Sequence, residues 1–241
     1  MARFQRLFQP TNIGTLQLPN RLVMPPMVTN YATEGGEVTQ RLIDYLTTRA
    51  RGGVGLIIVE ASYIRQDGKG FANQLGIHND GLVPGLARLV EAVHREGARI
   101  AIQIYHGGRQ TSSSITGSQP IAPSPIPDPS TREIPRELSV EEIHQVQQSF
   151  AEAAGRAKKA GFDAVEIHGA HGYLIAQFLS PFSNRRVDEY GIGIRGRAKF
   201  ALEVVDKVRQ VVGRDYPLLF RLSAEERVEG GLTIDQTRII A

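Results

Sequence analysis

Residues 162–173, with the sequence FDAVEIHGAHGY, decide the fold. Their first half alternates or runs apolar through Ile167 over the length of a strand, and Gly161 before it is typical of the end of a helix. Two imidazoles, His168 and His171, and the phenol of Tyr173 follow where this strand is expected to meet its loop. Because parallel strands carry binding sites at their carboxyl ends, we expect a buried strand that ends in a site.

Each of these side chains also has a plainer interpretation. A single histidine at a strand end is more often an ordinary loop residue whose hydrogen bonds are simply satisfied. Three titratable side chains clustered at one strand terminus are, however, typical of functional sites. The cluster therefore favours a site over a structural loop.

Expected strands and helices alternate along the rest of the chain. Apolar runs predict five strands, at residues 21–27, 54–59, 98–105, 162–167 and 216–222. Apolar residues at three- and four-residue spacing, with capping residues or glycines at the ends, predict helices at about residues 42–52, 80–97, 139–161 and 200–208. This repetition predicts an α/β fold with a parallel sheet, either a barrel or a doubly wound sheet. No Gly-x-Gly-x-x-Gly motif follows the first strand, which argues against a dinucleotide-binding Rossmann start.

Two segments outside this repeat have their own signals. Residues 7–18, with a turn at Gly14, predict a small hairpin that plugs one end of the fold. Residues 107–138 hold six of the thirteen prolines, so they are expected to form a long loop. Long loops in compact domains are usually lids or binding loops, and we expect this one to cover the site. An ordinary surface loop is the alternative.

The composition is that of a globular protein, with 41% hydrophobic and 22% charged residues among 241. We expect a single domain over residues 1–241. The net charge of +3 comes from scattered basic residues, so nucleic acid is not an expected partner. The chain has no cysteine, which excludes disulfides and thiolate metal sites. No apolar run approaches the ~18 residues of a membrane span, and no secretory segment is evident, so a cytoplasmic location is expected.

The expected strand ends bring a set of polar and apolar side chains to one edge of the sheet. They are Pro26, Met27, Val28, Glu60, Ala61, Gln103, His106, His168, His171, Tyr173 and Arg221. Such a pocket offers many hydrogen-bond donors and little negative charge, which suits an electron-rich planar ligand or a carbonyl under reduction. Taken alone, each of these side chains could have a structural role instead. Arg221, for example, could form an ion pair with Glu225 or Glu226.

Five motifs together carry a resemblance to a known family. They are residues 20–27 (NRLVMPPM), 49–56 (RARGGVGL), 103–109 (QIYHGGR), 160–173 (AGFDAVEIHGAHGY) and 178–181 (FLSP). The chain resembles the old yellow enzyme family, the NADH:flavin oxidoreductase (FMN-binding) type of TIM barrel. Within that family it looks most like the 2-enoate reductase and 2,4-dienoyl-CoA reductase branch.

The resemblance implies a TIM (β/α)8-type barrel, of which about the first five β/α units and an N-terminal β-hairpin are present. It implies FMN as cofactor, NADH or NADPH as electron donor, and reduction of the C=C bond of an enone or enoyl substrate. A homo-oligomer is a further expectation. Because the family's barrel has eight strands, we expect these 241 residues alone to self-associate, to hold FMN weakly and to have little activity.

The resemblance also implies roles for individual residues. The FMN-binding residues would be Pro25, Pro26, Met27, Val28, Ala61, Gln103 and Arg221. His168 and His171 would donate to the carbonyl oxygen of the substrate, with Tyr31 as a further substrate contact. Tyr173 would protonate the α-carbon, which is within the capacity of a phenol held in hydrogen-bond reach.

Two other functions are kept as alternatives. His106, His168 and His171, with Glu166, have the side chains of a zinc site, as in a metal-dependent barrel hydrolase. An inactive fragment or binding module is the third possibility. A flavin absorption band near ~450 nm would distinguish the FMN-dependent oxidoreductase from these two alternatives.

Overall fold

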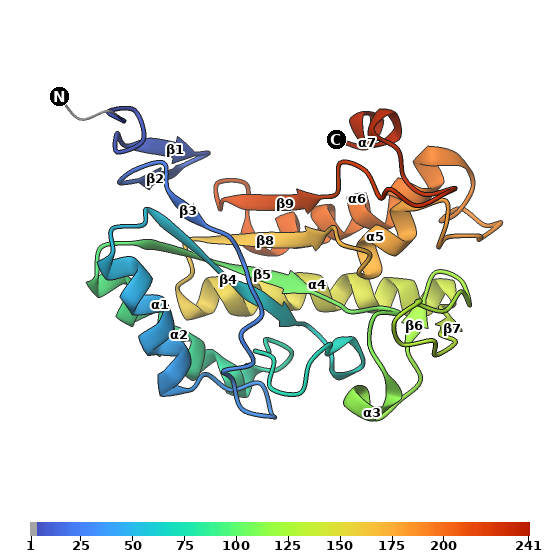
Figure 1. Ribbon diagram of the computed structural model, residues 1–241, viewed down its shortest axis with the longest axis horizontal. Coiled ribbons are helices and arrows are strands. Elements are labelled where there is room, and N and C mark those ends of the chain that lie inside the picture. Colours follow the sequence, from blue (N-terminus) through green and yellow to red (C-terminus); the bar gives the residue numbers. More distant parts are fainter. Residues whose placement is uncertain (1–3) are drawn as a thin grey trace.

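Five parallel strands form one curved sheet in the order β3, β4, β5, β8, β9 (Figure 1). Their bounds in this computed structural model, which describes residues 4–241, are Val23–Met24, Leu56–Tyr63, Arg99–Tyr105, Ala164–Gly169 and Leu218–Leu222. The sheet is an arc of a TIM-type barrel, because the long helices all cover its outer face. The expected α/β repetition is thus confirmed, and the barrel is chosen over the doubly wound sheet.

Four long helices connect the strands and pack side by side in chain order, α1 on α2, α2 on α4 and α4 on α6 (Figure 1). They are α1 (Gln40–Arg51), α2 (Val83–Arg95), α4 (Val140–Ala160) and α6 (Gly193–Val212). The predicted capping box of α4 is present, since the Ser139 side chain and Glu142 bond each other's backbone N–H. Gly161 ends the helix in the left-handed region, with a φ of 93°.

Shorter elements lie in the connections. They are β6 (Ile121–Ala122), β7 (Arg136–Glu137), α3 (Ser113–Thr116), α5 (Leu174–Leu179), α7 (Ile234–Ile240) and two 3-10 turns at Gln66–Gly68 and Asp80–Leu82. β6 and β7 pair with each other inside the long proline-rich connection. α7 begins at the capping box of Thr233 and Gln236.

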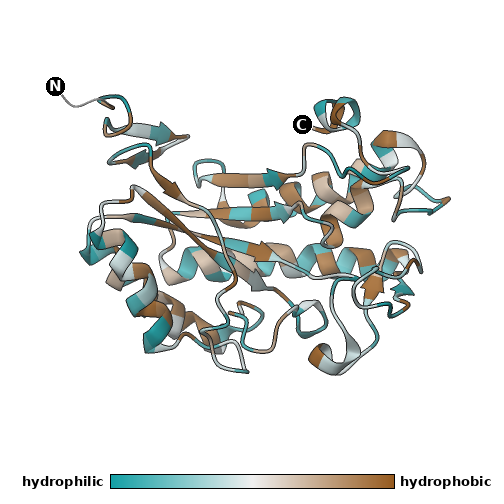
Figure 2. Cartoon of the chain, viewed as in Figure 1, coloured by the Kyte–Doolittle hydropathy of each residue, from teal (hydrophilic) through white to brown (hydrophobic). Residues whose placement is uncertain are grey.

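Side chains of each strand alternate between the outer and the inner face of the sheet. The outward residues, such as Ile102, Val165 and Ile167, join the apolar core under the helices. Figure 2 shows brown, hydrophobic stretches along the strands of the sheet. The inward residues change character along each strand: β8 begins with apolar Ala164 and continues with Glu166. The inner face is therefore apolar at its amino end and polar at its carboxyl end.

The predicted hairpin is formed by β1 (Thr11–Ile13) and β2 (Leu16–Leu18), which pair antiparallel. Leu18 is buried against Leu56, Ile58 and Ala101, the first inward residues of the strands. The hairpin thus closes the amino end of the arc, as predicted, and leaves the carboxyl end for a site.

Several predicted boundaries were wrong by a few residues. The first strand is limited to Val23–Met24, because the prolines that follow have no N–H for a ladder. The second strand continues past residue 59 to Tyr63. The strand predicted at 162–167 runs to Gly169, the one predicted at 216–222 begins at Leu218, and the last long helix begins at Gly193 instead of residue 200.

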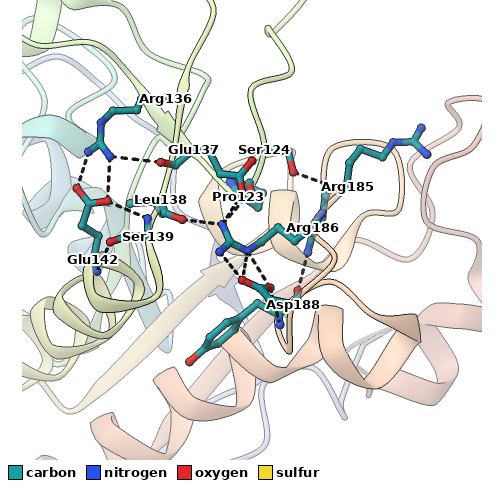
Figure 3. Close-up of polar contacts among 12 residues, drawn as sticks. Pro123, Ser124, Arg136, Glu137, Leu138, Ser139, Glu142, Arg185, Arg186 and Asp188 are labelled. Carbon is teal, nitrogen blue, oxygen red and sulfur yellow. Dashed lines mark hydrogen bonds and ion pairs between the residues drawn. The ribbon is translucent and has the colours of Figure 1, made fainter.

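Arg186 joins the two long connections of the carboxyl end (Figure 3). Its side chain is 5% exposed and donates to the carbonyl oxygens of Pro123 (3.2 Å) and Leu138 (2.6 Å). Asp188 balances its charge through contacts of 2.5–3.1 Å. Because a buried guanidinium must be paired, this arginine fixes the proline-rich connection to the loop between α5 and α6.

Replacing Gly169 with alanine should destabilise the fold. A Cβ there would lie 2.3 Å from the Phe220 ring and 3.0 Å from the carbonyl oxygen of Arg221, so β8 and β9 would have to separate. We expect a loss of about 1–3 kcal/mol in urea denaturation. Gly35→Ala, whose Cβ would meet nothing closer than 3.7 Å, is the matched control and should stay within about 0.5 kcal/mol. Equal stability of the two variants would contradict the close approach of the strands.

Candidate active site

A cavity of about 300 Å³ lies at the carboxyl ends of the strands. It is lined by Pro26, Met27, Val28, Asn30, Ala61, Phe71, Gln103, His168, His171, Tyr173 and Arg221. The structure therefore brings together nine of the residues predicted for the site, from all five strands. Asn30 and Phe71 were not predicted; Phe71 lies in an irregular segment after β4 and has no sequence signal.

Three predicted features of the site lie elsewhere. Pro25 does not line the cavity. Tyr31 does not line it either: its ring packs edge-on against Tyr45, with centroids 5.6 Å apart, and lies 3.8 Å beneath the Arg41 guanidinium. Residues 107–138 contribute nothing to the lining, so the predicted cover over the site is not seen; that connection is fixed beside it by Arg186.

His106 is directed away from the other two histidines. Its Nε2 lies 3.2 Å from Asp67 Oδ1, and its Nδ1 accepts from the backbone N–H of Gly108 at 3.0 Å. Both ring nitrogens are thus used inside the protein. Within residues 4–241 no group of three His, Cys, Asp or Glu side chains could hold a metal ion. The alternative of a three-histidine metal site is therefore wrong on geometry.

A β-bulge on β4 directs Ala61 into the cavity. Val59 pairs with Ile102 and Ser62 with Ile104, so two residues of β4, Glu60 and Ala61, face one residue of β5. The buried Glu60 carboxylate accepts from the backbone N–H (2.9 Å) and hydroxyl (2.5 Å) of Thr29. Burial raises the pKa of Glu60, and the Thr29 hydrogen bonds oppose that shift. Glu60 therefore holds the segment after β3 against β4, which places Met27 and Val28 at the site.

Beneath the cavity, Gln103, Glu166 and Arg221 form one hydrogen-bonded group. Gln103 Nε2 donates to Glu166 Oε1 at 2.6 Å. Arg221 donates from Nε at 2.9 Å and from Nη2 at 3.2 Å to the two oxygens of the same carboxylate. The predicted pairing of Arg221 with Glu225 or Glu226 is thus replaced by a buried partner. Glu166 stands two residues before His168, so the period-two rule already puts both on one face.

His168 and His171 form a pair of neutral donors. Burial, with His171 and Arg221 nearby, lowers the pKa of His168 to about 3, and burial and Arg221 also lower the pKa of His171. The Nδ1 atom of His168 accepts from the backbone N–H of Ala170 at 3.3 Å, so its ring proton lies on Nε2. That Nε2 is 3.4 Å from His171 Nδ1, so the Nε2–H of His171 is left for a ligand, whereas His168 can donate to a ligand only if its Nε2–H turns away from this long contact.

The backbone of His171 is held in a strained conformation. Its φ of 59° lies in the left-handed region, which is uncommon for a residue with a Cβ. Two contacts maintain it: its N–H donates to Ser223 Oγ at 3.0 Å, and its carbonyl accepts from Gln110 Nε2 at 2.8 Å. Sequence reasoning missed these two residues, because each acts across a separation of more than fifty residues.

Tyr173 stands next to the histidines with its phenol protonated. Its ring is edge-on to His168 (5.0 Å) and to Tyr105 (4.8 Å). Burial raises the pKa of Tyr173, and the charge of Asp128 adds to that shift. The site therefore holds three groups that carry a transferable or shareable proton at neutral pH.

The rest of the lining fits a planar, partly polar cofactor. Met27 is 66% exposed although it is apolar, so it offers a surface to a ligand. Val28 and Ala61 extend that apolar surface, while Gln103 and Arg221 present hydrogen-bonding groups. This division suits a flavin ring, which has an apolar end and a polar pyrimidine end. Fold and site together are those expected of a flavin-binding barrel protein.

Known proteins place the chain in a family. The sequence profile of the NADH:flavin oxidoreductase / NADH oxidase family matches residues 6–241, so the chain belongs to this family. It is 52% identical to an NADH oxidase of Thermoanaerobacter brockii over all of this chain, and 44% identical to an NADPH dehydrogenase of Clostridium acetobutylicum over 95% of it. The structure of a 2-naphthoyl-CoA reductase in complex with 2-naphthoyl-CoA superposes with a TM-score of 0.95 at 34% identity over 98% of the chain.

The chain spans 37% of the NADH oxidase, 67% of the NADPH dehydrogenase and 38% of the 2-naphthoyl-CoA reductase. The predicted family and its TIM-type barrel are therefore confirmed. The family is FMN-dependent and uses a nicotinamide electron donor. In the part of the chain that the structure describes, no helix is both long and apolar enough to cross a membrane.

Acidification should destabilise the protein through His168. In the folded state its pKa is about 3, whereas an unfolded histidine titrates near ~6.5, so between these values the unfolded chain binds the extra proton. Stability should fall as the pH drops below ~6.5, by up to about 1.4 kcal/mol per pH unit. Urea denaturation at pH 7 and pH 5 measures this loss. His168→Asn should lose less stability over the same interval; an unchanged pH slope would mean that His168 is not buried as described.

Proposed function

We propose that the whole protein binds FMN over the carboxyl ends of β3, β4, β5, β8 and β9 and reduces the C=C bond of α,β-unsaturated carbonyl compounds with hydride from NADH or NADPH. Bound FMN would supply the hydride chemistry that links nicotinamide oxidation to reduction of the substrate carbon. The observation that carries the proposal is the joint presence in one cavity of two neutral imidazoles, a protonated phenol and an apolar surface.

The cavity residues would hold the cofactor in two ways. The segment from Pro26 to Val28, with Ala61, would supply apolar surface and backbone polar groups. Gln103 and Arg221 would bind the polar end of the ring, where a cation stabilises negative charge. Their positions at the ends of β5 and β9 follow from the strand register.

The three protonated side chains would act on the substrate. His168 and His171 would donate to its carbonyl oxygen, and these hydrogen bonds would strengthen as negative charge develops there. Because both imidazoles are neutral, each is a donor that does not itself lose a proton. Tyr173 would transfer its phenolic proton to the α-carbon.

The names of the relatives support nicotinamide-linked reduction, and one of them acts on an acyl-CoA thioester. A thioester conjugated to a C=C bond has the carbonyl oxygen that the two histidines need. We therefore propose an enone or enoyl thioester as the substrate class, in line with the 2-enoate and 2,4-dienoyl-CoA reductase branch. A homo-oligomer remains part of this proposal for the whole protein.

Loss of either histidine should slow reduction of the substrate at least as much as reduction of the cofactor. For the FMN-loaded protein we expect His168→Ala and His171→Ala to slow alkene reduction by ~10² or more, because each removes a donor to the developing oxyanion. Reduction by NADH or NADPH should slow by a comparable or smaller factor, and stopped-flow absorbance near ~450 nm follows both steps.

His144→Asn is the control for these variants, since His144 pairs with Tyr190 outside the cavity, at 3.0 Å. Unchanged alkene reduction in both histidine variants would contradict the assigned roles. Failure of the whole wild-type protein to bind FMN would contradict the proposed function itself.

Tyr173→Phe should separate two kinds of electron acceptor. We expect slower reduction of an enone, which needs a proton on carbon, and unchanged reduction of a quinone, which does not. Tyr105→Phe is the matched control, because Tyr105 packs against Tyr173 but its hydroxyl is directed to Gln74, 3.3 Å away. Equal losses with both acceptors would show that Tyr173 only supports the fold of the site.

A further inference from the structure

Glu166 has no part in the proposed reaction, yet it bonds two residues that line the cavity. Its side chain lies on β8, is almost fully buried and does not itself line the cavity. Gln103 comes from β5 on one side, and Arg221 comes from β9 on the other. One carboxylate thus connects three neighbouring strands directly beneath the site.

The carboxylate determines which way the Gln103 amide faces. A carboxylate only accepts hydrogen bonds, so the amide group 2.6 Å from Glu166 Oε1 must be the NH₂. The reverse orientation would place two oxygens in repulsive contact. The amide oxygen of Gln103 accepts nothing from residues 4–241, and it is not among the enclosed polar atoms without a partner. It is therefore presented to the cavity as an acceptor.

The same carboxylate determines how Arg221 meets the cavity. Its Nε and Nη2 are used by the two oxygens of Glu166, which fixes the plane of the guanidinium. Its Nη1 donates to none of the residues that the structure describes, so these protons are left for a ligand. The polar end of the cavity therefore presents an acceptor and a donor in fixed positions.

We infer that Glu166 is a positioning residue that makes this end of the cavity selective for an imide edge, with the Gln103 oxygen accepting the ligand's N–H and Arg221 donating to its carbonyl oxygen. The inference rests on the proposed function, since the pyrimidine edge of FMN is such an imide, with N3–H between two carbonyl groups. A site built to pair with a donor discriminates against an analogue that lacks it.

Affinities for FMN and N3-methyl-FMN test this inference without any turnover. Flavin fluorescence quenching gives both dissociation constants, and the wild-type chain should bind FMN about tenfold more tightly than the methylated analogue. In Glu166→Gln the amide at position 103 is no longer oriented, so the preference should fall to within about threefold. Loss of the Arg221 partner affects both ligands, and the ratio of the two constants removes that shared effect.

Glu203→Gln is the matched control. Glu203 also holds a glutamine amide, that of Gln147 at 2.7 Å, but between α4 and α6 and away from the cavity. This variant should keep the wild-type ratio, and a ratio that falls equally in both variants would overturn the inference. An unchanged ratio in Glu166→Gln would overturn it as well, whereas no FMN binding by the wild-type chain would instead refute the proposed function.

Gln103→Ala covers the case in which Glu166→Gln does not fold, which circular dichroism would show. This variant leaves the Glu166–Arg221 pair in place and removes only the acceptor. It should lose the preference for FMN over N3-methyl-FMN. If it keeps the wild-type ratio of the two dissociation constants, the Gln103 amide does not distinguish FMN from N3-methyl-FMN and the inference is wrong.

Discussion

The parallel register of β5, β8 and β9 is the constraint on which the site depends. Gln103 lies opposite Glu166, and His168 lies opposite Arg221, so neighbouring strands place their polar side chains at matching heights. A slip of one residue would turn every inward side chain toward the helices. The buried apolar face prevents that slip, because Val165 and Ile167 would otherwise leave the core. The core under the helices therefore fixes the chemistry on the other side of the sheet.

Two buried carboxylates convert this register into a rigid site. An isolated buried charge is costly, and each carboxylate here is satisfied by groups that also shape the cavity. Glu60 binds the segment after β3, and Glu166 binds Gln103 and Arg221. Loss of either carboxylate would leave its hydrogen-bond partners unsatisfied. It would also displace a residue that lines the cavity. The same hydrogen bonds thus stabilise the fold and hold the cavity residues in position for a ligand.

Most of this arrangement could be predicted from the sequence, but some parts of it could not. The parallel α/β alternation and the strand-end cluster of His168, His171 and Tyr173 follow from local periodicity, which is strong in buried strands. The bulge at Glu60 and Ala61 was not predictable, because it is a relation between two strands and leaves no mark in one of them. The misplacement of Tyr31 has a similar cause. Its aromatic and cationic neighbours belong to α1, and only the folded chain shows that they are closer than the cavity.

The separation of Glu166 and Arg221 in the sequence has a consequence during synthesis. The carboxylate and its cation are 55 positions apart in the sequence, which is roughly 3 to 11 seconds of translation. During that interval β8 has left the ribosome, but Arg221, the partner of Glu166, has not. Until β9 arrives, Glu166 has the Gln103 amide but not its cation, which favours a hydrated inner face of β8. The site is therefore the last part of this arc to form on a growing chain.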